Sequence, residues 1–230
     1  MKIKILSYNI HKGFNIGNRH FILEEIKHAL NETQADVLFL QEILGENNQH
    51  KIPNWKTSIQ FEYIADVVWP HYAYGKNAIY PEGHHGNAIL SKYPITQWEN
   101  HNISTNRFEQ RGFLKAEITH PESHEKVIVC NTHLDLTQGG REKQANFIIK
   151  KLENEKMPWV LVGDFNDWNF QISKLIEQNL CAHDVFQTLH GRFPKTYPSI
   201  FPILSLDRVF SFKMKPTLAK ILNDSHCKKL

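Results

Sequence analysis

The stretch from Pro158 to Asn166 constrains the fold of this chain more than any other. It runs through the apolar residues Trp159-Val160-Leu161-Val162 and ends in Gly163-Asp164-Phe165-Asn166. A short β-rich run that is bounded by glycine is typical of a buried strand. Because side chains alternate along a strand, we expect Asp164 and Asn166 on one side and Phe165 on the other. Taken alone, this ending predicts an Asx turn; a site that holds a water, a metal ion or a phosphate oxygen is the alternative.

Length and composition favour one folded domain over residues 1–230. Hydrophobic residues make up 41% of the 230 residues and aromatic residues 11%, which is enough for a substantial core and excludes disorder. The net charge of +3 permits an anionic ligand without requiring one. The chain has no internal repeat, no low-complexity tract and no Pro/Gly/Ser-rich linker.

Cysteine usage and hydropathy indicate a cytoplasmic protein. The three cysteines, Cys130, Cys181 and Cys227, are odd in number and lack a C-x-x-C spacing. This argues against a disulfide framework and against a structural zinc site, so we expect free thiols. The first residues are too short an apolar run for a signal peptide, and no stretch is long enough for a transmembrane segment.

Strand-like and helix-like segments are mixed along the chain. Apolar residues at spacings of three and four, such as Ile22, Ile26 and Leu30, predict a helix over 19–30. A second helix is expected at 141–152. The predicted strands are 2–9, 35–41, 87–91, 97–103, 112–119, 126–133, 159–163 and 206–211.

Polar residues stand at the ends of several predicted strands. Each has an ordinary structural explanation, for example a turn at Asn9, a loop start at Glu42, or a salt bridge between Asp207 and Arg208. Together they supply carboxylates and a carboxamide for a hard cation, a histidine, and an aspartate that could orient an imidazole. The set comprises Asn9, Glu42, His133, Asp164, Asn166 and Asp207.

Six short motifs, in order from residue 7 to residue 210, resemble those of the endonuclease/exonuclease/phosphatase family, which has the DNase I-like fold. The segment from Tyr72 to Pro94 is most similar to an uncharacterised bacterial branch. The resemblance implies a four-layer α/β/β/α sandwich and Mg²⁺-dependent cleavage of phosphate esters. The motifs are Ser7-Tyr8-Asn9-Ile10, Leu40-Gln41-Glu42, Gly86-Asn87-Ala88-Ile89-Leu90-Ser91, Asn131-Thr132-His133-Leu134, Gly163-Asp164-Phe165-Asn166 and Leu206-Asp207-Arg208-Val209-Phe210.

The resemblance also implies a role for each matching residue. Asn9 and Glu42 would be ligands of Mg²⁺, with Mn²⁺ as the alternative ion. Asp164 would orient or deprotonate the attacking water, and Asn166 would hold the phosphate or that water. His133 would donate to a non-bridging phosphate oxygen, which stabilises the charge of the transition state.

The carboxyl end of the chain departs from the family pattern. Asp207 should orient a second histidine, which family members carry in a Ser-Asp-His motif before a last strand. This chain ends in Asn223-Asp224-Ser225-His226-Cys227-Lys228-Lys229-Leu230. One interpretation takes Asp224 and His226 as a rearranged motif. We favour the other, in which the sequence stops just before the motif, so that the domain lacks its last strand and a catalytic histidine.

Three further residues are candidate substrate contacts: Asn87, Arg111 and Tyr197. The Arg111 guanidinium could clamp a phosphate through two hydrogen bonds, and a surface ion pair with Glu109 or Glu117 is the alternative. The neighbouring His84 and His85 suggest a metal site, but adjacent side chains point in different directions and no third soft ligand has a suitable spacing. We therefore interpret this histidine pair as substrate-loop residues.

Three functions remain open for a monomeric protein with this pattern. The first is a nuclease-type phosphodiesterase with nucleic acid as its partner, although Lys and Arg are scattered along the chain. The second is a phosphodiesterase or phosphatase acting on a phospholipid headgroup or a small phosphate ester. Phe201-Pro202-Ile203-Leu204 is a candidate apolar rim for its peripheral membrane contact. The third is an inactive binding protein, against which the retained polar residues argue.

Overall fold

Two β-sheets form the centre of the molecule, in a computed structural model that describes residues 2–15, 20–47 and 59–222. The strands are β1 (Ile5–Asn9), β2 (Val37–Asn47), β3 (His71–Tyr80), β4 (Gly83–Ser91), β5 (Ile95–Asn102), β6 (Gly112–Thr119), β7 (Lys126–His133), β8 (Trp159–Asp164), β9 (His183–Asp184) and β10 (Asp207–Phe212). The first sheet has the order β1-β2-β4-β3, and the second has the order β5-β6-β7-β8-β10-β9.

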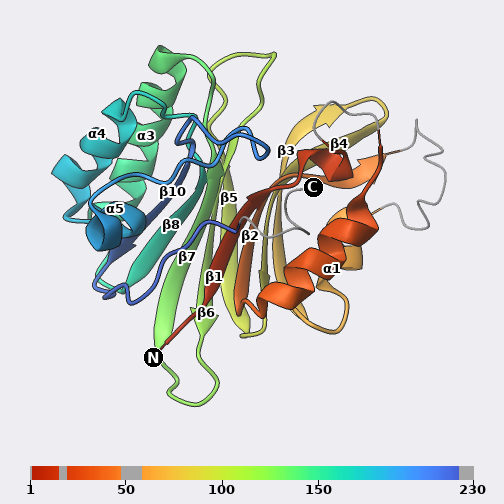
Figure 1. Cartoon of the computed structure of the whole chain (residues 1–230), viewed down its shortest axis with the longest axis horizontal. Helices are drawn as coiled ribbons and strands as arrows, with labels where there is room; N and C mark the ends of the chain where they lie inside the picture. The colour runs from red at the N-terminus through yellow and green to blue at the C-terminus, as the bar shows by residue number, and fades with distance from the viewer. Residues whose placement is uncertain (1, 16–19, 48–58, 223–230) are drawn as a thin grey trace.

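Helices cover the outer face of each sheet, which gives four layers in the order α/β/β/α (Figure 1). The first sheet is covered by α1 (Leu23–Thr33) and α2 (Gln60–Ala65), and the second by α3 (Gln138–Leu152), α4 (Gln171–Leu180) and α5 (Val185–His190). A short 3₁₀ turn, η1 (His11–Gly13), follows β1. The sandwich expected from the sequence is confirmed. No helix within the described residues is long and apolar enough to span a membrane.

Burial on both faces of the central strands explains their continuous apolar runs. In β8, Val160 and Val162 pack in the cluster between the sheets, whereas Trp159 and Leu161 pack against the helices of the second sheet. Phe165 continues the helix-facing row and is fully buried. The prediction that Phe165 turns away from its neighbours Asp164 and Asn166 is therefore confirmed.

The expected elements are largely present, with shifted ends. The predicted strands 112–119 and 126–133 coincide with β6 and β7, and the helix expected at 19–30 is observed at Leu23–Thr33. The sequence analysis did not identify β3 or the helices α2, α4 and α5. In β3 the exposed and covered positions alternate irregularly, so its sequence has no clean period of two. The terminal motif at Asp224 and His226 lies outside the described residues.

A buried amide joins the two sheets at their centre. The Asn131 Nδ2 of β7 donates hydrogen bonds to the carbonyl oxygens of Leu40 (2.9 Å) and Ala88 (2.8 Å) in the first sheet. Its Oδ1 accepts a hydrogen bond from Gln41 Nε2 at 2.8 Å. All of these side chains are fully buried, so each of the bonds is shielded from water.

We expect Asn131→Ala to lower the free energy of unfolding by about 3 kcal/mol, because the substitution leaves buried donors and acceptors unpaired. Urea unfolding followed by circular dichroism measures this loss. Asn179→Ala is the matched control, since the exposed Asn179 amide makes one bond to Leu175 O on the surface of α4. A loss under about 1 kcal/mol for Asn131→Ala would contradict the assigned role.

Candidate active site

Strand pairing gathers five of the predicted site residues at one edge of the sandwich. Asn9 ends β1 and Glu42 lies in the parallel neighbour β2. In the second sheet His133 and Asp164 end the parallel strands β7 and β8 and are paired directly across the ladder. Asp207 begins the antiparallel β10 and is opposite Asp164. The carboxyl ends of β7 and β8 and the start of β10 thus meet at the same edge.

A glycine permits the close approach of β7 and β8 beside the site. Gly163 has a φ of +148°, and a Cβ atom at this position would lie 1.9 Å from the carbonyl oxygen of Thr132. Any other residue would push the strands apart at the point where His133 and Asp164 are paired. The glycine before Asp164 therefore sets the spacing of the site.

One carboxamide and two carboxylates converge across the two sheets. Asn9 Nδ2 lies 3.3 Å from Glu42 Oε1 and 3.4 Å from Asp164 Oδ2. Glu42 reaches this position from a β-bulge between Leu40 and Ile43, where its φ is +56°. Burial raises the pKa of Glu42, but the nearby His133 and other positive or donating groups outweigh it, and the net shift is downward. Glu42 is therefore held as a carboxylate.

The donor set of this trio fits a hard divalent cation. Amide and carboxylate oxygens are the ligands that Mg²⁺ takes when it keeps several of its waters. Asn9 Oδ1 accepts a hydrogen bond from His11 N at 3.1 Å, and its Nδ2 faces the carboxylates, so binding an ion would require the amide to turn. Among the described residues no group of three or more His, Cys, Asp and Glu side chains forms a metal cluster.

His133 lies between the two carboxylates in a defined tautomer. Its Nδ1 is 3.8 Å from Glu42 Oε1 and its Nε2 is 3.7 Å from Asp164 Oδ2. Arg111 Nη1 lies 3.1 Å from Nδ1 and can only donate, so Nδ1 accepts and Nε2 carries the hydrogen. Burial, assisted by the Arg111 charge, lowers the pKa of His133 against the pull of the carboxylates. The imidazole is thus a neutral donor that faces Asp164.

Asp164 and Asn166 combine both interpretations of their motif. Asp164 Oδ1 accepts a hydrogen bond from Asn166 N at 3.0 Å, which is the local turn expected of an Asx residue. Asn166 has a φ of +49° and donates its Nδ2 to Leu134 O at 2.9 Å. Because the turn uses only Oδ1, Asp164 Oδ2 remains directed at Asn9 and His133. The turn therefore positions the carboxylate for the site.

Asp207 does not form the side-chain salt bridge with Arg208 that was the structural alternative. The fully buried Arg208 donates instead to Ser173 Oγ and to the carbonyl oxygens of Ser205, Asp207 and Asp167. These bonds join β10 to the start of α4. Burial and the facing Asp164 carboxylate raise the pKa of Asp207 to about 7, although Arg208 favours the ionised form.

The candidate substrate contacts lie on two sides of this centre. Arg111 is bonded to His133 and lies 3.7 Å from Glu109, and it makes no ion pair with Glu117. Asn87 is buried and donates its Nδ2 to Gly112 O at 3.1 Å, so only its oxygen is left for a ligand. Tyr197 is half exposed on the opposite side, in a groove that it shares with Asp164 and Asp207.

The sequence analysis missed positive charge beside Glu42. His11 and Lys12 of η1 both act on this carboxylate and lower its pKa. They directly follow the strand that ends in Asn9, and this adjacency was the available signal. Lys12 also contributes to the low pKa of His85, which burial chiefly lowers to about 4.

Removing the Asp207 charge should stabilise the metal-free protein at high pH. The native pKa near 7 exceeds the unfolded value, so the native state binds an extra proton between about pH 4 and 7 and loses stability as the pH rises through this range. We expect Asp207→Asn to match the wild type near pH 4 and to exceed it by about 2 kcal/mol at pH 8. Urea unfolding in EDTA at both pH values tests this, and equal stability at pH 8 would refute it.

Solved structures share this architecture. The endonuclease/exonuclease/phosphatase from Beutenbergia cavernae DSM 12333 superposes with a TM-score of 0.73 at 17% identity, over 92% of this chain and 64% of that chain. The mannosyl-6-phosphatase of Bacteroides thetaiotaomicron gives 0.67 at 17% identity, over 92% and 86%. D. rerio TDP2 in complex with a single-strand DNA product gives 0.64 at 18% identity, over 94% and 86%. At these identities the likeness establishes the fold.

Sequence comparison reaches further than the fold. The uncharacterized protein YbhP of Escherichia coli K12 is 38% identical over 211 residues, which cover 90% of this chain and 83% of that protein. The sequence profile of the endonuclease/exonuclease/phosphatase family matches residues 6–222, a range that includes every site residue described above. The chain belongs to the endonuclease/exonuclease/phosphatase family.

Proposed function

We propose that the protein is a divalent-metal-dependent phosphodiesterase of nuclease type. The observation that carries this proposal is the convergence of Asn9, Glu42 and Asp164, with contacts of 3.3 and 3.4 Å, next to the neutral His133. Members of the family hydrolyse phosphate esters and generally depend on a divalent metal ion. Mg²⁺ is the proposed ion, with Mn²⁺ as the alternative, because the donors are hard oxygen atoms.

Each half of the site has a distinct task in this proposal. Asn9 and Glu42 would hold the ion, which when bound supplies positive charge that makes the phosphorus more electrophilic. Asp164 Oδ2 would accept a proton from the attacking water, while its Oδ1 stays bonded to the turn at Asn166. His133 would donate its Nε2 hydrogen to a non-bridging oxygen, and Asn166 would hold the phosphate or the water. No covalent intermediate with the enzyme is required.

Arg111 would act on the same phosphate group from the other side of His133. Its bond to His133 Nδ1 keeps the hydrogen on Nε2, where the donor is needed. The guanidinium also adds a positive charge that remains at every physiological pH. Asn87 and Tyr197 are proposed to contact the remainder of the substrate on the two sides described above.

We also propose that a strand bearing a Ser-Asp-His motif completes this site. Within the described residues β1 is an edge strand of the first sheet, and a groove of about 1810 Å³ runs beside it between the sheets. Apolar side chains such as Ile5 and Val209 line this groove, so a further strand paired with β1 would cover them. Asp207, whose raised pKa reflects the lack of a close positive partner, would orient the added histidine.

A phosphate ester at a lipid surface is the second candidate substrate. Ile200 and Phe201 are each 73% exposed and Ile203 is 53% exposed, in the loop that precedes Asp207. Exposed apolar side chains next to a site are what a peripheral membrane contact requires. The nuclease reading draws support from the DNA product in the structure of D. rerio TDP2, a protein of the same fold. An inactive binding protein is the third candidate.

Asp164→Ala should abolish turnover. We expect a loss of at least about 10²-fold in kcat on single-stranded DNA, plasmid DNA, RNA, phospholipid vesicles or a generic phosphodiester, because the proton acceptor is removed. EDTA should have the same effect, and Mg²⁺ should reverse it. Glu122→Ala is the matched control, since Glu122 is exposed in the turn between β6 and β7, at the other end of β7 from His133. Turnover that survives Asp164→Ala would refute the mechanism, and activity confined to lipid would refute the nuclease assignment.

Adding a tail with a Ser-Asp-His motif after Leu230 should raise activity. We expect a gain of at least about tenfold in Mg²⁺-dependent phosphodiesterase activity, because the tail supplies a histidine for Asp207 to orient. A tail in which alanine replaces that histidine separates this effect from simple covering of the groove. Equal activity of the three forms would contradict the proposal.

A further inference from the structure

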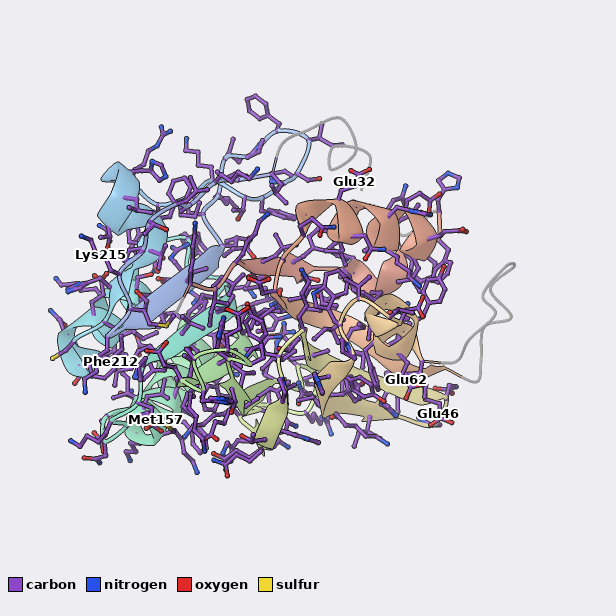
Figure 2. The ribbon with its side chains drawn as sticks, turned by 90° about the horizontal axis from the view of Figure 1, so that it is seen from below. Glu32, Glu46, Glu62, Met157, Phe212 and Lys215 are labelled. Carbon is purple, nitrogen blue, oxygen red and sulfur yellow. The ribbon has the colours of Figure 1, made fainter. Side chains whose placement is uncertain are left out.

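The adjacent histidines of β4 point to opposite faces of the first sheet. His84 Nδ1 is 2.9 Å from the hydroxyl of Tyr74 and its Nε2 is 3.8 Å from Glu46 Oε2. Figure 2 shows Glu46 at the same outer end of the molecule as Glu62 of α2. His85, the next residue, faces the other way, toward the second sheet and Glu42. The pair is therefore divided between an outer surface and the active-site edge.

His85 lines a hollow of about 210 Å³ between the two sheets. β4 and the end of β3 form one wall, and the segment that carries Arg111 forms the other. Glu42 and His133 close the hollow on the side of the catalytic centre. Two of its wall residues are already bonded across the sheets, since Asn77 accepts from Asn100 and Asn87 donates to Gly112 O.

The two nitrogen-rich side chains in this hollow keep unused hydrogen-bonding atoms. His85 Nδ1 and Arg111 Nε are both buried, and neither has a hydrogen-bond partner among the described residues. Leaving such atoms unpaired costs about 1–3 kcal/mol each, which natural proteins accept mainly where a ligand completes the bond. Both atoms belong to residues of one small hollow that opens beside Glu42.

We propose that His85 is a substrate-binding residue, and that its imidazole and the Arg111 guanidinium together hold one non-bridging oxygen of the substrate phosphate on the Glu42 side of the site. The proposal rests on the proposed function in taking the ligand to be a phosphate ester. Glu42 is the only acidic residue lining the hollow, and Arg111 supplies a permanent positive charge. A neutral imidazole beside a guanidinium adds a directed hydrogen bond without a second charge to desolvate.

This arrangement places recognition on both sides of the catalytic centre. His133 lies between Glu42 and Asp164, and the water and its proton acceptor belong on the Asp164 side. The hollow lies on the other side, away from Asp164 and Asp207, which are not among its lining residues. His85 would therefore affect how tightly the phosphate binds and leave the proton transfer to Asp164.

Inorganic phosphate is the probe for a first test that requires no turnover. We would titrate the full chain with phosphate, with and without Mg²⁺, and follow the histidine ring Cε1–H signals by NMR. We expect the His85 signal to shift and the His84 signal to stay in place. In His85→Ala the phosphate Kd should rise about tenfold, since one hydrogen bond to an anion is lost, and His85→Asn should recover part of the affinity.

Steady-state kinetics with a phosphodiester substrate provide the second test. His85→Ala should raise KM about tenfold and leave kcat within about threefold, because uniform binding is lost and the reacting groups are untouched. His84→Ala is the matched control and should change neither value. A thermal unfolding scan of each variant confirms that the fold is retained, and the wild-type NMR titration stands even where a variant fails to fold.

The outcomes separate this inference from the proposed function. Phosphate binding that depends on His85 in a protein without turnover supports the inference and refutes the phosphodiesterase. Turnover with the same KM and phosphate Kd in the wild type and His85→Ala overturns the inference and leaves the phosphodiesterase standing. A wild type that shows no shift of the His85 signal at any phosphate concentration, with or without Mg²⁺, also overturns it.

Discussion

The buried carboxamide of Asn131 is the contact on which the geometry of the site depends. The site is built from two sheets, with Asn9 and Glu42 on the first and His133 and Asp164 on the second. Hydrophobic packing holds the sheets together but has no direction, and apolar faces could slide with little cost. The Asn131 bonds have direction, and a shift of one residue would leave several buried groups unpaired. They lie one residue before Glu42 and two residues before His133.

Patterning along the chain was sufficient to predict the central strands but not the edges. Strands β6, β7 and β8 are buried on both faces, so their apolar runs identify them without knowledge of the partner strands. Strand β3 is an edge strand whose faces are unequally covered, and this depends on the neighbours that it meets. Helix α4 carries the spacing Ile172, Ile176 and Leu180, so its pattern was present in the sequence and was overlooked.

Motif resemblance was sufficient to predict which residues share the site, but not how each side chain is used. Glu42 depends on a β-bulge and a left-handed backbone, which no spacing rule anticipates. Asn87 was expected to contact substrate, and the structure commits its nitrogen to Gly112 O. The separate directions of His84 and His85 were predicted from strand alternation, whereas the hollow that His85 lines needed the second sheet to become visible.

The division of the site between two sheets couples ion binding to the cohesion of the sandwich. Under the proposed function, an ion held by Asn9 and Glu42 next to Asp164 would act as a staple between the layers, since its ligands separate when the sheets separate. By mass action, such an ion present at a hundred times its Kd adds about 2.7 kcal/mol to the free energy of unfolding. The carboxylates that repel one another without the ion would then become a source of cohesion. Metal supply would thus set the lifetime of the folded chain as well as its activity.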